Sequence, residues 1–152
     1  MSGTEAERGA IGDLAPSLDE AGVGGFMHPT ITTCTSSTPL TEVAELMATQ
    51  QIHCVVVLEE TRRGRDGEPG WGIVSDLDLV AAAAAVEDGT AGEIAASPLV
   101  TVDRDEPLAR AAQLMAEHGS AHLMVVAAGE DHPVGIISTL DVARCLALRA
   151  AP

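Results

Sequence analysis

Apolar and polar residues follow the same two patterns twice along the chain. In the first pattern, apolar side chains recur at intervals of three or four residues, which places them on one face of a helix. The two predicted helices start at Pro39 and at Pro107. Proline suits a helix start because its missing N–H would have no partner there. The apolar positions are Leu40, Val43, Ala44 and Met47 in the first helix, and Leu108, Ala111, Ala112 and Met115 in the second.

Short apolar and β-branched runs surround each of these helices and predict strands. One run precedes each helix, two runs joined by a polar loop follow it, and a second helix ends the unit. The order β-α-β-β-α therefore occurs twice. The predicted strands are Thr30–Thr33, Val55–Leu58 and Gly72–Val74, then Leu99–Val102, Leu123–Val126 and Val134–Ile137, and the closing helices are Asp76–Glu87 and Thr139–Leu148.

The two units also match residue by residue. Pro39–Met47 corresponds to Pro107–Met115, and Gly72–Asp78 corresponds to Gly135–Asp141. The polar loop at 59–70 absorbs most of the difference in length. One three-stranded sheet with two helices is only marginally stable. We therefore predict an α/β (α+β) fold in which two repeats pack through their sheets with pseudo-twofold symmetry.

The repeats divide the chain into three parts. Residues 1–24 form a predicted flexible N-terminal segment, residues 25–89 the first repeat and residues 90–152 the second. Within the N-terminal part, Asp13–Ala21 favours a short helix and Gly22–Gly25 a hinge-like stretch. A further short helix is predicted at Thr90–Ala96, where the second repeat begins.

Composition and charge exclude several functions. The chain has 23 acidic residues against eight basic ones, a net charge of −15 that repels nucleic acid. All eight basic residues are arginine, so a phosphate-loop lysine and Schiff-base chemistry are excluded. Three widely spaced cysteines favour a reducing cytoplasm over a disulfide framework. No apolar run is long enough to cross a bilayer, and we expect no membrane association.

A Gly-x-x-Ser-x-x-Asp turn lies where a strand ends and a helix begins in both repeats, with Ser75 and Asp78 in the first and Ser138 and Asp141 in the second. Unpaired N–H groups at a helix start attract phosphate oxygens, and a serine hydroxyl adds a donor. The aspartate can accept hydrogen bonds from both hydroxyls of a ribose. Helix capping accounts for the same four residues, so ligand binding and capping both stay open.

These features resemble a tandem cystathionine-β-synthase-type (CBS) repeat, also called a Bateman module. Met27-His28-Pro29 with Ser97-Pro98, the two proline-led helices and the two Ser-x-x-Asp turns carry the resemblance, which covers about Gly25 to Leu148. It implies a non-enzymatic regulatory module that binds AMP, ADP, ATP with Mg²⁺ or S-adenosylmethionine, requires no cofactor, and dimerises. The ligand-binding positions that it implies are Thr30, Ile31, His53, Ser75, Asp78, Leu99, Val100, His122, Ser138 and Asp141.

The sequence departs from the family in one respect, because His53-Cys54 and Ala121-His122 stand where small residues commonly line the adenine pocket. An imidazole there can stack on a base, crowd it out or donate to phosphate. Bases that would neutralise phosphate are few, and Arg104 and Arg144 are the best placed, near the ends of elements. The strong negative charge favours AMP-like or adenosyl ligands, or ATP with Mg²⁺, over a free polyphosphate.

Two other functions stay open beside an adenosyl-ligand sensor that acts on an unidentified regulated protein. One is a ligand-free homodimerisation or scaffold module, for which the small-residue helix face at Ala81–Ala85 is suited. The other is a metal or thiol-redox sensor that uses Cys34, the cysteine expected to be most exposed. No zinc-ligand spacing supports a metal, and no nucleophile–base signature supports catalysis.

Overall fold

The computed structural model describes residues 18–63, 69–85, 88–95, 100–130 and 132–150. It divides into two compact units. One, here called the central unit, is Ile31–Leu99. The other, here called the terminal unit, combines the two ends of the chain, Met1–Thr30 and Val100–Pro152. The start of the first repeat, up to Thr30, thus belongs to the same unit as the second repeat.

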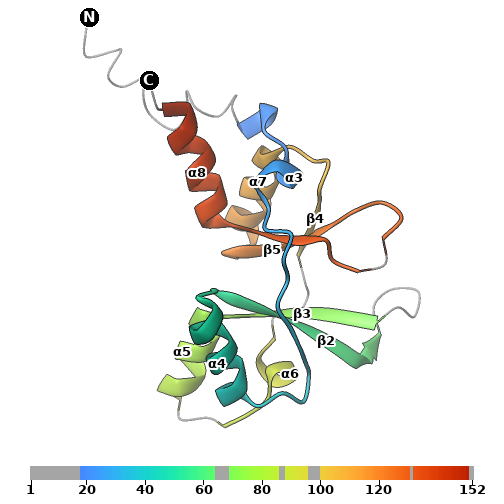
Figure 1. Ribbon diagram of the computed structural model, residues 1–152, viewed down its shortest axis with the longest axis vertical. Helices are drawn as coiled ribbons and strands as arrows, with labels where there is room; N and C mark the ends of the chain where they lie inside the picture. The colour runs from blue at the N-terminus through green and yellow to red at the C-terminus, as the bar shows by residue number, and fades with distance from the viewer. Residues whose placement is uncertain (1–17, 64–68, 86–87, 96–99, 131, 151–152) are drawn as a thin grey trace, which may run out of the picture. The chain divides into compact units, whose positions relative to one another are not determined.

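The central unit is a three-stranded sheet with helices on one face (Figure 1). Strand β2 lies in the middle, parallel to β1 and antiparallel to β3. Its core consists of Val43, Met47, Val55, Val57, Val74 and Ala91. The elements are β1 Thr33–Thr35, α4 Leu40–Gln50, β2 Cys54–Arg63, β3 Pro69–Ser75, α5 Asp76–Ala84 and α6 Ala91–Ile94.

The terminal unit repeats this arrangement. Strand β5 lies between β4, to which it is parallel, and β6, to which it is antiparallel. Helix α7 buries one whole face, which includes Leu108, Ala111 and Met115 from the predicted set and also Leu114. The elements are α3 Val23–Phe26, β4 Thr101–Asp103, α7 Leu108–His118, β5 His122–Val126, β6 Gly135–Ser138 and α8 Thr139–Ala150.

The predicted α/β (α+β) class and the doubled β-α-β-β-α order are confirmed. The packing of the repeats through their sheets with pseudo-twofold symmetry stays a prediction. Most boundaries lie within a few residues of the predicted ones. The hairpin in the central unit is longer than predicted, because the pairing of β2 with β3 continues past Glu59, opposite Gly70, to Arg63, opposite Pro69.

The strand predicted at Thr30–Thr33 is wrong in its position. The chain before Thr30 pairs with β6, since His28 N donates to Ile136 O at 2.8 Å and Ile136 N donates to His28 O at 3.0 Å. Regular pairing with β2 begins only at Thr33, which lies opposite Val56. A single extended run therefore serves the sheets of both units, one after the other.

The hinge predicted at Gly22–Gly25 is also wrong, because Val23–Phe26 is a helical turn packed into the terminal unit. Val23 is fully buried, and its N–H donates to Glu106 O at 2.9 Å. A Cβ atom on Gly24 would lie 3.2 Å from Arg104 O, so this glycine permits a close backbone approach. Residues 18–20 are helical, which agrees with part of the helix predicted at Asp13–Ala21. Its first residues lie outside the described part.

Candidate ligand-binding turns

The turn of the central unit is a helix cap with an open carboxylate. Ser75 Oγ accepts from Asp78 N at 3.2 Å, and Asp78 Oδ2 accepts from Ser75 N at 2.8 Å. These two bonds form a capping box, so the predicted capping role is present. The Ser75 hydroxyl proton and Asp78 Oδ1 are not used by this cap. Asp78 is half-buried and therefore within reach of a ligand.

His53 and Cys54 lie at the open end of the same hairpin. His53 Nδ1 lies 2.9 Å from Asp76 Oδ2, and the backbone carbonyl of His53 accepts from Asp76 N. Cys54 pairs with Ser75 across β2 and β3. Burial, assisted by the negative charge of Asp76, raises the pKa of the Cys54 thiol from 9.0 to about 11. The thiol is therefore neutral at physiological pH and contributes no anion to the turn.

The turn of the terminal unit is held much more tightly. Asp141 is 1% exposed and is the buried charged residue of the described core. Its Oδ2 accepts from Ser138 N at 2.8 Å and from Ser138 Oγ at 3.0 Å. Its Oδ1 lies 3.0 Å from His28 Nε2 and accepts from Arg144 Nη1 at 3.3 Å. A carboxylate offers about four lone-pair sites, so these contacts occupy its acceptor capacity.

The position of His28 depends on the glycine of the terminal turn. A Cβ atom on Gly135 would lie 2.7 Å from Met27 Sδ and 2.8 Å from His28 O. Such contacts are too short for an alanine unless the backbone of the Met27–His28 segment moves. The isolated pairing of His28 with Ile136 fixes the segment beside β6. Glycine at this place in the motif thus permits the contact between His28 and Asp141.

The remaining predicted positions divide between the units. In the central unit Ile31 is half-buried and His53 is exposed. In the terminal unit Thr30 is exposed, whereas Val100 and His122 are half-buried. His122 pairs with Ser138 across β5 and β6, in the place that Cys54 takes beside Ser75. Leu99 lies outside the described residues. In each unit a residue of the middle strand, Cys54 or His122, thus lies opposite the serine of the Ser-x-x-Asp turn.

Two of the groups at the terminal turn were not predicted as ligand positions. From the sequence, His28 is identified only among the residues that carry the family resemblance, and Arg144 only as a base near the end of an element. The Met27-His28-Pro29 tripeptide carries no signal that it will pair with a strand from the far end of the chain. The spacing of Asp141 and Arg144 does indicate that they share one face of a helix.

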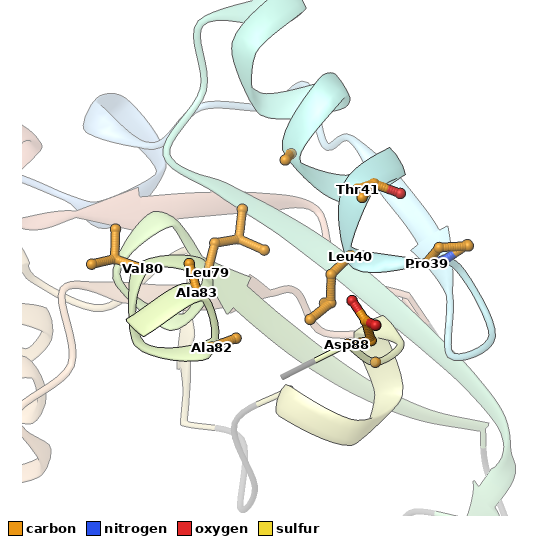
Figure 2. Close-up of a pocket in the computed structure, with 10 residues that line it drawn as sticks. Pro39, Leu40, Thr41, Leu79, Val80, Ala82, Ala83 and Asp88 are labelled. Atoms are coloured by element: carbon orange, nitrogen blue, oxygen red, sulfur yellow. The ribbon is translucent and has the colours of Figure 1, made fainter. Parts of the chain in front are cut away.

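The two grooves that the structure describes lie beside the helices that follow these turns. The one in the central unit has a volume of about 570 Å³ and lies between α4 and α5 (Figure 2). It is mostly apolar, and Asp88 contributes its one carboxylate. The one in the terminal unit, about 440 Å³, lies between α7 and α8. Neither is lined by any of the ten predicted ligand positions.

Metal and redox chemistry have little support among the described residues. No group of three or more His, Cys, Asp or Glu side chains is placed to hold a metal ion within this part of the chain. Cys34, Cys54 and Cys145 are free thiols, and Cys145 is buried. Burial also raises the pKa of Cys34, so its thiol is less reactive than predicted. No helix in the described segments is long and apolar enough to span a membrane.

Comparison with known proteins identifies similar folds. The family profile described as CBS domain matches residues 23–85 and 91–148. The CBS domain pair of protein MJ0100, solved with 5′-methylthioadenosine and S-adenosyl-L-methionine, is 22% identical with a TM-score of 0.71, over 85% of this chain and 98% of that one. CBS domain protein PAE2072 from Pyrobaculum aerophilum, complexed with AMP, is 25% identical with a TM-score of 0.70, over 85% and 97%.

A third similar structure contains metal. Hypoxic Response Protein I, solved with two coordinated zinc ions, is 25% identical with a TM-score of 0.63, over 82% of this chain and 98% of that one. No curated protein matches the chain.

Proposed function

Since this chain belongs to the CBS domain family, we propose that it is a non-enzymatic regulatory module that binds an adenosyl ligand, AMP, ADP, ATP with Mg²⁺ or S-adenosylmethionine, at its Ser-x-x-Asp turns. The observation that carries the proposal is the open state of the central turn. Its Ser75 hydroxyl can donate, and Asp78 Oδ1 has no partner among the described residues. A polar group of the ligand suits the first, and a ribose hydroxyl suits the second.

Two similar proteins support the ligand class. PAE2072 was solved with AMP, and the MJ0100 domain pair with 5′-methylthioadenosine and S-adenosyl-L-methionine. All three ligands carry an adenosyl group. Ile31 and His53 in the central unit, and Thr30, Val100 and His122 in the terminal unit, are the described positions proposed to contact the base. Ser138 and Asp141 can bind a ligand in the way proposed for Ser75 and Asp78 only after His28 and Arg144 leave the Asp141 carboxylate.

The oligomer that we propose is a homodimer formed through the helices. Large apolar side chains are exposed on α5, where Leu77 is 71% and Val80 is 62% exposed, and on α8, where they are Leu140 and Leu148. Val80 and Leu79 continue into the groove between α4 and α5 (Figure 2). Exposed apolar side chains of this kind are costly in water, and a second copy that covers them relieves the cost. Ligand binding would then change a surface that a regulated protein can recognise.

The test is a thermal shift measured with AMP, ADP, ATP with Mg²⁺ and S-adenosylmethionine. A ligand at about 100 times its Kd stabilises the folded state by about 2.7 kcal/mol and raises the midpoint. Asp78→Ala should abolish the part of the shift that comes from binding at the central turn, whereas Asp105→Ala, at an exposed turn of the terminal unit, should leave every shift unchanged. If all four ligands give flat curves at millimolar concentration, the chain is a scaffold module and the proposal is wrong.

A further inference from the structure

The two turns differ in the charged residues that surround the aspartate. At the terminal turn one carboxylate, Asp141, contacts two bases, His28 and Arg144. At the central turn the matching helix positions hold Asp76, in the place of Thr139, and Ala81, in the place of Arg144. The central turn therefore has two carboxylates, Asp76 and Asp78, and the imidazole of His53 contacts Asp76. The three arginines of the central unit all lie at or after the far end of β2.

The bases of the terminal turn are held by a buried group and directed outward. Asp141 is 1% exposed, but His28 is 55% and Arg144 is 54% exposed. Among the described residues Arg144 uses one of its five N–H donors, and His28 Nδ1 has no partner. Both bases contact the same oxygen, Asp141 Oδ1, so the free guanidinium donors of Arg144 lie near the His28 ring at the surface. Guanidinium donors in this arrangement suit a phosphate.

Resting on the proposed function, we infer that the two turns select different adenosyl ligands. The terminal turn is the phosphate-selective one, in which Arg144, held beside His28, binds the phosphate of an AMP-type nucleotide. Asp141 is a positioning residue there: it orients the two bases and does not take the ribose hydroxyls, which its burial excludes. The central turn, with two carboxylates, repels phosphate. It binds adenosyl ligands that are uncharged or cationic, such as 5′-methylthioadenosine or S-adenosylmethionine.

The experiment is isothermal titration of the full chain with AMP and with 5′-methylthioadenosine. Arg144→Ala should weaken AMP binding about tenfold or more, the effect expected for one charge-assisted hydrogen bond, and leave 5′-methylthioadenosine binding within about twofold. Asp78→Asn should do the reverse. Arg110→Ala is the matched control, because it removes the same charge from the same unit, and Arg110 donates to Gln113 instead of Asp141.

Asp141→Asn tests the positioning role. It keeps the shape of the side chain but removes the charge that holds both bases, so the ratio of AMP to 5′-methylthioadenosine affinity should fall towards that of Arg144→Ala. If Arg144→Ala weakens both ligands equally, or neither, the division of ligands is wrong while the proposed function stands. If neither ligand binds to the unaltered chain, the division of ligands is wrong, and the thermal shifts with all four ligands decide the proposed function separately.

Discussion

His28 Nε2 lies 3.0 Å from Asp141 Oδ1, although the two residues come from opposite ends of the chain. His28 lies near the start of the first repeat, and Asp141 in the last helix of the second. The contact forms because His28 pairs through its backbone with Ile136, just before the turn. A residue outside the second repeat thereby completes the charge arrangement of that repeat's own motif.

Gly135→Ala should separate His28 from Asp141 without changing either side chain. The new methyl group would lie 2.7 Å from Met27 Sδ and 2.8 Å from His28 O, so the segment has to move away from β6. We expect a loss of stability of about 1–3 kcal/mol, as is typical of overpacking at a tight site. Amide exchange should also accelerate at His28 and Ile136, which hydrogen-bond each other.

Gly129→Ala is a control of a different kind. Gly129 lies in an exposed turn at φ +83, with nothing within 4 Å of an added Cβ atom. The substitution costs backbone strain there, but it should leave the exchange rates of His28 and Ile136 unchanged. Equal acceleration in both variants would show that the effect is global unfolding and not displacement of the segment.

Asp141→Ala should destabilise the chain more than Asp78→Ala. Asp141 is buried and accepts two bonds from Ser138 and contacts two bases, so its removal should cost about 2–3 kcal/mol. Asp78 is half-buried and takes part only in the capping box, worth about 1 kcal/mol. Urea unfolding of both variants measures the difference. Equal losses would mean that Asp141 acts only as a cap.

The repeat and its elements were predictable because each depends on local pattern. The apolar spacing of Leu108, Ala111 and Met115 is that of a buried helix face, and the structure buries all three. The Ser75–Asp78 cap was also predictable, since a capping box needs only residues three positions apart. Both predictions rest on interactions within a single element or turn.

The features that were missed depend on contacts between distant segments. Nothing local to Val23–Phe26 predicts a helical turn, which forms because its N–H groups reach the carbonyls of Arg104 and Glu106. In the same way, His28 reaches Asp141 only through pairing of its backbone with β6. Two Ser-x-x-Asp turns that look alike in the sequence therefore differ in burial and charge, since distant residues decide which groups surround each carboxylate.

Cys54 should react slowly with iodoacetamide until the pH is far above neutral. Its pKa is raised from 9.0 to about 11, mainly by burial and further by the charge of Asp76. At pH 8 roughly one thiol in a thousand is ionised, against about one in ten for an ordinary thiol, so alkylation should be about a hundredfold slower. Mass spectrometry of quenched samples follows each cysteine separately, and the urea-unfolded chain is the reference.

The same shift makes stability depend on pH in a defined direction. The folded pKa is above the unfolded one, so the folded state holds the proton more tightly. The resulting stabilisation is fully present below about pH 9 and is lost as the pH rises through about 11. Cys54→Ser should weaken this loss in urea unfolding between pH 9 and 11. If Cys54 is alkylated at the rate of the unfolded chain at pH 8, its burial is not as described.

Val80→Asp should dissociate the proposed homodimer without unfolding the chain. Val80 is 62% exposed, so a charged side chain at this position meets water in the monomer and costs little there. In a dimer formed through α5 the same charge would be buried against apolar side chains, Leu77 among them, which is unfavourable by several kcal/mol. Analytical ultracentrifugation at several concentrations should show a monomer for this variant.

Ala128→Asp, in an exposed turn away from α5, adds the same charge and should leave the dimer intact. A wild-type chain that stays monomeric at high concentration would contradict the dimer itself, whereas a Val80→Asp dimer as tight as the wild type would mean that other helices form the interface.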